Sequence, residues 1–251
     1  MARTDRFASR WGLILAALGM AIGTGNIWRF PRIIAANGGG TFLIPWLIFL
    51  FSWSIPLLIV ESAMGKKARR GTVGAFTTLL GGKSAWKGAF IGFCTMAISF
   101  YYCVVAGWCT FYLVASVTGR LRGQDAQIYW DSFAGNGFLQ ILFLLIALTI
   151  CAAIVWRGVS AGIEKVNKIL IPALFVILVI AALRAVTLPG AGAGMEYLFH
   201  FDLAGLANYR VWLEALSQSA WSTGAGYGLL LTYAVYMRQK QNIVFSAVTT
   251  G

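Results

Sequence analysis

The sequence contains little charge and very little acid. Of its 251 residues, 11% are charged and 59% are hydrophobic, and eight Asp and Glu residues stand against 20 Lys and Arg. The mean hydropathy is +0.76. About a quarter of the residues in a soluble globular protein are charged. This composition excludes an ordinary soluble domain and indicates a membrane protein.

Groups that carry enzyme chemistry or bind transition metals are also scarce. The sequence has one histidine, His200, and four cysteines, and no nucleophile lies close to a base along the chain. All four cysteines fall within apolar runs, where a free cysteine is a small core residue rather than part of a disulfide framework. We therefore expect a protein that is not an enzyme.

Apolar runs long enough to cross a bilayer follow one another along the whole chain. A transmembrane helix needs about 20 consecutive, mainly apolar residues. The sequence predicts an all-α integral membrane protein in which residues 1–251 form a single transmembrane domain of six transmembrane helices. The predicted spans are 11–35, 41–62, 86–117, 137–156, 167–188 and 209–236.

The net charge of +12 could suggest a nucleic-acid partner, but the basic residues are sorted by loop. They gather before the first span, between spans two and three, between spans four and five, and after span six. Lysine and arginine accumulate in cytoplasmic loops. The pattern therefore predicts a multi-pass protein with a cytoplasmic N-terminus, surrounded by a lipid bilayer, and no nucleic-acid partner.

Two of the regions between the predicted spans are expected to contain short helices. In the basic stretch 65–85, Val73, Phe76 and Leu80 recur at helical spacing, which predicts a small interfacial helix. The stretch 189–208 is expected to contain a short outer helix, and the stretch 119–136 is predicted to be a polar outer loop.

The first and sixth predicted spans contain glycine-rich interruptions. Residues 19–31 read GMAIGTGNIWRFP, and span six places Gly224, Gly226 and Gly228 beside Ser222. Each glycine costs a helix about 1 kcal/mol relative to alanine. Non-helical backbone at membrane depth survives only where protein or a wet cavity surrounds it. Two broken spans are therefore typical of a binding site near the middle of the bilayer.

The glycines have a second explanation, because Gly19 and Gly23 also fit a motif that lets two helices pack closely. The polar Asn26 and Ser222 beside the two glycine clusters favour the binding site. Each break would expose N–H groups that suit an anion and carbonyl groups that suit Na⁺ or an ammonium group.

Several motifs resemble the neurotransmitter:sodium symporter family, of the bacterial amino-acid transporter type with a leucine-transporter-like fold. The motifs are WRFP at 28–31, NGGG at 37–40 followed by Phe42, PLLIVESAMG at 56–65, the pair Tyr101–Tyr102, RGVSAGIEKVNKILIP at 157–172 and TYAVYMR at 232–238. Arg32 departs from the family pattern, in which tyrosine is common at this position.

The resemblance implies sodium-coupled symport of a neutral amino acid by alternating access, in the cytoplasmic membrane of a bacterium or archaeon. The alternative is a non-transporting amino-acid sensor or accessory membrane subunit with the same fold. Helices 1–5 would form the first inverted repeat, and helix 6 would open the second. Because the family has about twelve helices, we expect this chain to be the N-terminal half of a longer protein. In this interpretation the half ends at the cytoplasmic run 241–251. Its partner would be the missing C-terminal helices or a second chain.

The resemblance also implies two Na⁺ sites, both incomplete within this chain. The first takes the side chain of Asn26, the carbonyl group of Ala21, and the hydroxyl and carbonyl groups of Ser222. The second takes the carbonyl groups of Gly19 and Ile22. The remaining family ligands lie on later helices, and chloride dependence is left open.

The substrate site implied by the resemblance lies between the two breaks. Its members are Ala21, Gly23, Thr24, Gly25, Ile98, Tyr102, Trp221, Ser222, Gly224 and Tyr227. The N–H groups of Thr24 and Gly25 and the hydroxyl group of Tyr102 would hold the substrate carboxylate. Relatives that carry monoamines have aspartate at the position of Gly23, so this glycine favours a substrate with its own carboxylate.

Gating and support are assigned to other polar residues. Arg29 and Gln218 match outer-gate positions, and Tyr102 with Trp221 would form a lid over the substrate. The acidic partner of Arg29 is expected from the absent half, which would leave this arginine without a counter-charge here. Glu61 is assigned a structural role, hydrogen bonded near the break in helix six.

Overall fold

The computed structural model describes residues 6–22 and 25–251, and every regular element within these ranges is a helix. The first span and the beginning of the second are built from α1 (Arg10–Ala21), η1 (Gly25–Arg29), α2 (Phe30–Ala36) and α3 (Gly40–Phe49). The chain continues through η2 (Leu50–Ser54), α4 (Ile55–Ala68), α5 (Thr72–Leu80), η3 (Gly82–Ser84) and α6 (Ala85–Val117).

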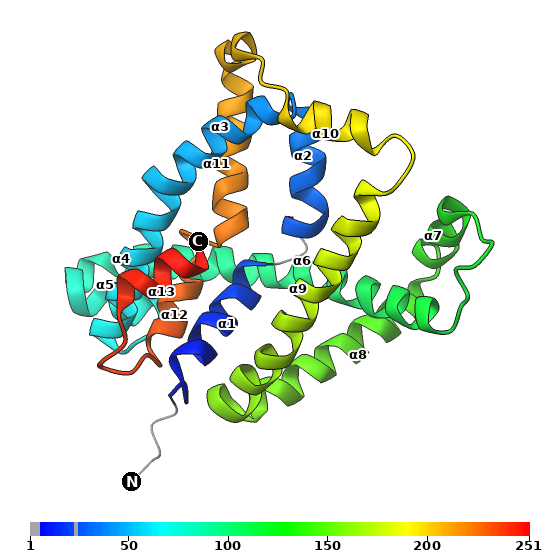
Figure 1. The fold of residues 1–251 in the computed structure, drawn as a ribbon. Helices are drawn as coiled ribbons and strands as arrows, with labels where there is room; N and C mark the ends of the chain where they lie inside the picture. Colours follow the sequence, from blue (N-terminus) through cyan, green and yellow to red (C-terminus); the bar gives the residue numbers. More distant parts are fainter. Residues whose placement is uncertain (1–5, 23–24) are drawn as a thin grey trace.

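The second half of the chain contains two long apolar helices, one span that is broken into two helices, and several short helices. These elements are α7 (Ala126–Ala134), α8 (Gly137–Trp156), η4 (Val159–Glu164), α9 (Lys165–Val186), α10 (Ala191–Phe199), η5 (Leu203–Ala207), α11 (Tyr209–Thr223), α12 (Leu229–Ala234) and α13 (Ile243–Thr250). In Figure 1, α2, α3 and α11 lie above α1, α4 and α12, while α8 and α9 extend to one side.

Within the described residues, four helices are long and apolar enough to cross a membrane. They are Gly40–Ala68, Gly82–Val117, Gly137–Trp156 and Val159–Val186, and the bent pair Arg10–Ala21 with Asn26–Ala36 makes a fifth span if it is counted as one. The sixth predicted span is present as α11 and α12, but its break leaves two segments of 15 and 6 residues. In α6, α8 and α9, only 6% of the most apolar window is buried within the protein. Such bare apolar surface suits lipid or further protein.

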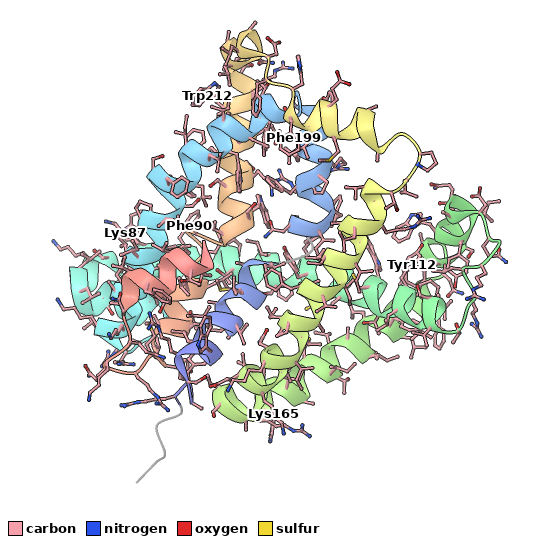
Figure 2. All side chains as sticks on the ribbon, in the orientation of Figure 1. Lys87, Phe90, Tyr112, Lys165, Phe199 and Trp212 are labelled. Atoms are coloured by element: carbon pink, nitrogen blue, oxygen red, sulfur yellow. The ribbon has the colours of Figure 1, made fainter. Side chains whose placement is uncertain are left out.

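We call the side formed by the segments 66–70, 83–87, 157–168 and 238–240 the basic face, and the side formed by α7, α10 and η5 the opposite face. Figure 2 shows Lys87 and Lys165 toward the basic face and Phe199 and Trp212 toward the opposite face. Polar residues begin several helices, since the side chains of Asp125, Asn136, Asn208 and Asn242 accept hydrogen bonds from the first backbone N–H groups of α7, α8, α11 and α13.

The glycines of the NGGG motif allow α10 to lie across the turn between α2 and α3. A Cβ atom on Gly39 would lie 2.2 Å from the carbonyl oxygen of Tyr197, and one on Gly40 would lie 2.7 Å from that of His200. Gly39 also has a φ of +60°, which favours glycine. The Tyr197 hydroxyl closes the contact by donating to the Ala35 carbonyl at 2.7 Å.

Two segments differ from the sequence prediction. The polar loop 119–136 contains α7, whose aromatic side chains pack on α6; the rings of Phe111 and Phe133 stack with centroids 3.9 Å apart. The run 241–251, predicted as a cytoplasmic run, contains the helix α13, which packs along α4 and α1. Ala247 is fully buried, and a Cβ atom on Gly251 would lie 2.9 Å from the side chain of Ile55, midway along its span. The helix predicted within 65–85 is present as α5.

Candidate functional site between the helix breaks

The break in the first span follows Ala21, where α1 ends. The helix resumes at η1, and the two parts of the span meet at 57°. Two predicted site residues, Gly23 and Thr24, lie outside the described residues. Gly25 begins η1, directly after this break.

The break in the sixth span is built from glycines in left-handed conformations. Gly224, Gly226 and Gly228 have φ angles of +67°, +90° and +68°. A residue with a Cβ atom is strained in this region. The glycines therefore let the chain leave the helical path at Thr223 and return to it at Leu229.

Glu61 on α4 binds the free backbone N–H groups at this second break. Its Oε1 atom accepts hydrogen bonds from the N–H groups of Gly226 at 2.8 Å and Gly228 at 3.2 Å, and its Oε2 atom accepts from Leu231 at 3.4 Å. The side chain is buried. A carboxylate here occupies the positive end of α12, where helical N–H groups lack partners.

A cavity of about 170 Å³ lies between the two breaks and α6. Six of the predicted substrate residues line it: Ala21, Ile98, Tyr102, Trp221, Gly224 and Tyr227. The rings of Trp221 and Tyr227 are in contact, with centroids 5.7 Å apart. Ser222 is not among the lining residues. None of the described residues that line the cavity carries a charged side chain.

Four further residues that had not been singled out from the sequence also line the cavity: Met20, Thr95, Ser99 and Leu229. Thr95, Ser99 and Tyr102 recur at helical spacing on α6, so this polar stripe was readable in the sequence. The Thr95 hydroxyl also lies 2.5 Å from the carbonyl oxygen of Tyr227, which ties α6 to the second break.

Asn26 joins the two breaks. Its Nδ2 atom donates to the carbonyl oxygens of Ala21 and Ser222, both at 3.0 Å, while its Oδ1 atom is buried without a hydrogen-bond partner among the described residues. The two ends of an amide group are nearly equal in size. A half-turn of this amide would bring Oδ1 beside both carbonyl oxygens. Three oxygen atoms would then converge, and hard oxygen ligands of this kind suit a Group 1 or Group 2 cation.

Gly19 and Ile22, predicted for a second sodium site, lie at the end of α1, where helical carbonyl groups run out of partners. Gly19 also has a packing role, since a Cβ atom there would lie 2.2 Å from the Oδ1 atom of Asn167 on α9. The packing explanation of this glycine is therefore supported by the contact between α1 and α9.

Arg29 has a counter-charge within this chain, so the expectation that it would lack one was wrong. Its Nη2 atom lies 3.6 Å from the Oε2 atom of Glu214 on α11. Its Nη1 atom donates to the Oε1 atom of Gln218, and the Nε2 atom of Gln218 donates to the hydroxyl oxygen of Ser222 at 2.9 Å. Sequence reasoning missed Glu214, although Glu214, Gln218 and Ser222 follow one another at four-residue intervals on one helix face.

The segment before α1 is packed against α1, η4 and the residues after α12. Phe7 is fully buried in a cluster with Leu13, Val159 and Met237. The backbone N–H of Ala8 donates to the carboxylate of Glu164 at 2.6 Å, and the Nε atom of Arg238 donates to the Phe7 carbonyl at 3.0 Å.

Comparison with known proteins identifies the family to which this arrangement belongs. A model described as the sodium:neurotransmitter symporter family matches residues 4–134 and 132–251. The chain belongs to this family. The resemblance read from the sequence motifs is thus confirmed, and with it the predictions of a membrane transporter family and of a protein that is not an enzyme.

Individual members of the symporter family match nearly the whole chain. An uncharacterized sodium-dependent transporter of Methanocaldococcus jannaschii is 37% identical over 98% of this chain and 52% of its own length. The sodium-dependent serotonin transporter of Drosophila melanogaster is 32% identical over 99% of this chain and 46% of its own length. A human relative named an inactive sodium-dependent neutral amino acid transporter is 33% identical over 94% of this chain and 42% of its own length.

The fold agrees with a solved member of the symporter family. The crystal structure of MhsT in complex with L-phenylalanine superposes with a TM-score of 0.86, at 37% identity, over 98% of this chain and 57% of that one. The two structures therefore share their fold over nearly the whole of this chain. It spans about half the length of the curated relatives that it matches.

Proposed function

We propose that this chain forms part of a symporter that couples the entry of Na⁺ to that of a neutral amino acid by alternating access. The observation that carries the proposal is the cavity between two helix breaks, with Ala21 from the first break and Gly224 from the second in its lining. Asn26 bridges the carbonyl groups of both breaks. Interrupted helices that meet near the middle of the membrane are the usual location of substrate and ion sites in such transporters.

Sodium would bind where Asn26 joins the breaks. The carbonyl oxygens of Ala21 and Ser222 already face this amide at 3.0 Å, and the Oδ1 atom of the same amide supplies a third oxygen. The hydroxyl group of Ser222 is a further candidate ligand. Gly19 and Ile22 would contribute carbonyl groups to a second site, at the negative end of the α1 dipole. In a symporter the bound ion stabilises the arrangement that holds the substrate.

The substrate would lie in the cavity with its carboxylate toward the hydroxyl group of Tyr102 and the backbone N–H groups of Thr24 and Gly25. Its ammonium group would face the carbonyl groups of Ala21, Trp221 and Ser222. The uncharged lining supports a neutral amino acid with an apolar or aromatic side chain. The related transporter MhsT was crystallised in complex with L-phenylalanine, an amino acid of this class, which supports the same choice.

The basic face would lie in the cytoplasm, with the N-terminus, and the membrane would be a cell membrane. Tyr102 and Trp221 would cover the substrate from the opposite side, while Arg29 and Gln218 would form part of the gate above them. The buried segment around Phe7 would have to withdraw for release into the cell.

Uptake into proteoliposomes tests this proposal. The whole protein is reconstituted and given a mixture of labelled neutral amino acids, with an inward Na⁺ gradient or with choline in its place. We expect accumulation only with the Na⁺ gradient. Uptake that is indifferent to Na⁺ would overturn the proposal. Saturable, Na⁺-dependent binding without uptake would favour a sensor or accessory subunit instead, an alternative that gains weight from the relative named as inactive.

A further inference from the structure

The polar side chains on the opposite-face side of the cavity form a connected chain that extends beyond the predicted site. It starts at Asn26, which donates to the backbone carbonyl of Ser222, and continues from the Ser222 hydroxyl through Gln218 and Arg29 to Glu214. The guanidinium group of Arg29 thus contacts a neutral amide on one side and a carboxylate on the other. Both partners lie on α11, so the outer parts of the first and sixth spans are joined by this arginine.

The position of Arg29 creates an electrostatic problem for a bound cation. Arg29 and Asn26 belong to the same short segment, η1, and are three residues apart. A positive charge this close to the Asn26 amide would repel a cation held there, and the repulsion would be stronger than in water because protein surrounds both groups. Glu214 supplies the opposite charge at 3.6 Å from the guanidinium group.

A purely structural role explains this ion pair poorly. The side chain of Glu214 is 44% exposed and that of Arg29 is 22% exposed. Solvent-exposed ion pairs contribute little to folding stability, because water screens them and side-chain freedom is lost when they form. The long-range field of the arginine still acts on an ion inside the protein, where screening is weaker.

We infer that Glu214 is a positioning residue for the sodium site: it neutralises Arg29 and so allows a cation to bind at Asn26. The inference rests on the proposed function, because it requires that Na⁺ binds between the helix breaks. Glu214 itself does not touch the ion. It acts through Arg29, and its effect on Na⁺ binding should disappear when an uncharged residue replaces this arginine.

The experiment measures Na⁺ binding to the whole protein in detergent without any amino acid. The thermal unfolding temperature is followed while NaCl replaces choline chloride at constant ionic strength, since a ligand that binds the folded state raises this temperature. The variants are Glu214→Gln, Arg29→Gln and the double variant Arg29→Gln with Glu214→Gln. Glu196→Gln, on the exposed surface of α10, is the matched control.

We expect Glu214→Gln to raise the half-saturating Na⁺ concentration about three- to tenfold, the scale of one uncompensated charge near a partly solvated site. The double variant should return to within about twofold of the parent protein, as should Glu196→Gln. Glu214→Gln that binds Na⁺ like the parent would overturn the inference, and so would a double variant that stays as weak as Glu214→Gln alone. A parent protein whose unfolding temperature ignores Na⁺ would instead overturn the proposed function itself.

Discussion

Glu61 shows how one side chain can stabilise a broken helix inside a membrane protein. Where α11 ends and α12 begins, backbone N–H groups lose their helical acceptors, and an unpaired N–H group in lipid or in a dry interior is costly. The two carboxylate oxygens of Glu61 accept three of these N–H groups. The acid is therefore part of the second break rather than of the cavity, whose lining does not include it.

The substitution Glu61→Gln should lower the thermal unfolding temperature. Glutamine offers one acceptor oxygen where glutamate offers two, and hydrogen bonds to a charged acceptor are worth about 1.5–3 kcal/mol each. The measurement is thermal unfolding in detergent, followed by tryptophan fluorescence. Glu196→Gln, which removes an exposed carboxylate from α10, should leave the temperature unchanged. Equal unfolding temperatures for both variants would contradict the role given to Glu61.

Tyr102 and Tyr101 provide a matched pair for testing the substrate site. Tyr102 lines the cavity, whereas the adjacent Tyr101 is 51% exposed and does not. Tyr102→Phe should weaken amino-acid binding by about 1.5–3 kcal/mol, since it removes a hydrogen bond to a charged carboxylate. This corresponds to roughly 10- to 150-fold in the dissociation constant.

Equilibrium binding of a labelled amino acid to the purified whole protein measures the effect. Tyr101→Phe should bind like the parent protein, and neither variant should change the unfolding temperature by much, because only a hydroxyl group is lost. If Tyr102→Phe bound normally, the substrate carboxylate would have to lie elsewhere in the cavity.

At the residue scale, sequence reasoning found site residues whose chemistry is unusual for a membrane span. It missed site residues of the apolar types that are common in such spans. Asn26 and Glu61 stand out because polar side chains are rare in apolar runs. Met20 and Leu229 carry no such signal, so only the folded chain shows that they line the cavity. Glu214 was passed over because the partner of Arg29 was assigned to helices outside this chain.

At the scale of elements, the break in the sixth span depends on glycines for two separate reasons. Gly224 and Gly228 both have positive φ angles, which cost an alanine roughly 1–2 kcal/mol. Their surroundings differ. A Cβ atom on Gly224 would meet nothing closer than 3.7 Å among the described residues, whereas one on Gly228 would lie 2.6 Å from Thr72 of α5 and 2.9 Å from Ile91 of α6.

We therefore expect Gly228→Ala to lower the unfolding temperature more than Gly224→Ala does. Gly224→Ala should instead act mainly on amino-acid binding, because Gly224 lines the cavity and Gly228 does not. Gly192→Ala on α10 is the control, since a Cβ atom there would meet no described atom within 4 Å. The measurements are the thermal unfolding temperature and the dissociation constant for the amino acid of each of the three variants. The reverse order for the two break variants would contradict this account.

The long elements were predictable because apolar length alone specifies them. The predicted span 137–156 coincides with α8, Gly137–Trp156, and the glycine clusters marked both breaks. Short elements carry too little signal. Helix α7 has nine residues, and it is held by aromatic contacts to α6 that no single stretch of sequence displays. Helix α13 follows a polar turn and reads as a loop until α4 and α1 are seen beside it.

At the scale of the whole molecule, charge is distributed unevenly between the two ends of the spans. The loops of the basic face carry most of the lysine and arginine residues, as Figure 2 shows for Lys87 and Lys165. The opposite face is formed by α7, α10 and η5 and carries few of them. Basic residues stay on the cytoplasmic side during insertion. The charge distribution therefore predicts a cytoplasmic basic face, from residues that take no part in the candidate site.

Labelling of single cysteines with a membrane-impermeant maleimide tests this orientation. In a variant with serine at Cys94, Cys103, Cys109 and Cys151, one cysteine is placed at Gln124 on the opposite face or at Lys83 on the basic face, both exposed. In intact cells the reagent should label Gln124→Cys and not Lys83→Cys, because only the opposite face meets the outside. After permeabilisation both should be labelled to a similar extent, which shows that both sites are accessible.

The cysteine-free variant must retain Na⁺-dependent stabilisation, so that the labelled protein has its native fold. Labelling of Lys83→Cys in intact cells, with Gln124→Cys protected, would invert the orientation. The segment around Phe7 would then close the cavity from the outside rather than from the cytoplasm, and the gate at Arg29 would face inward. Na⁺ and substrate would then have to enter past α1 instead of past α11. The orientation therefore decides the direction in which the proposed transport cycle runs.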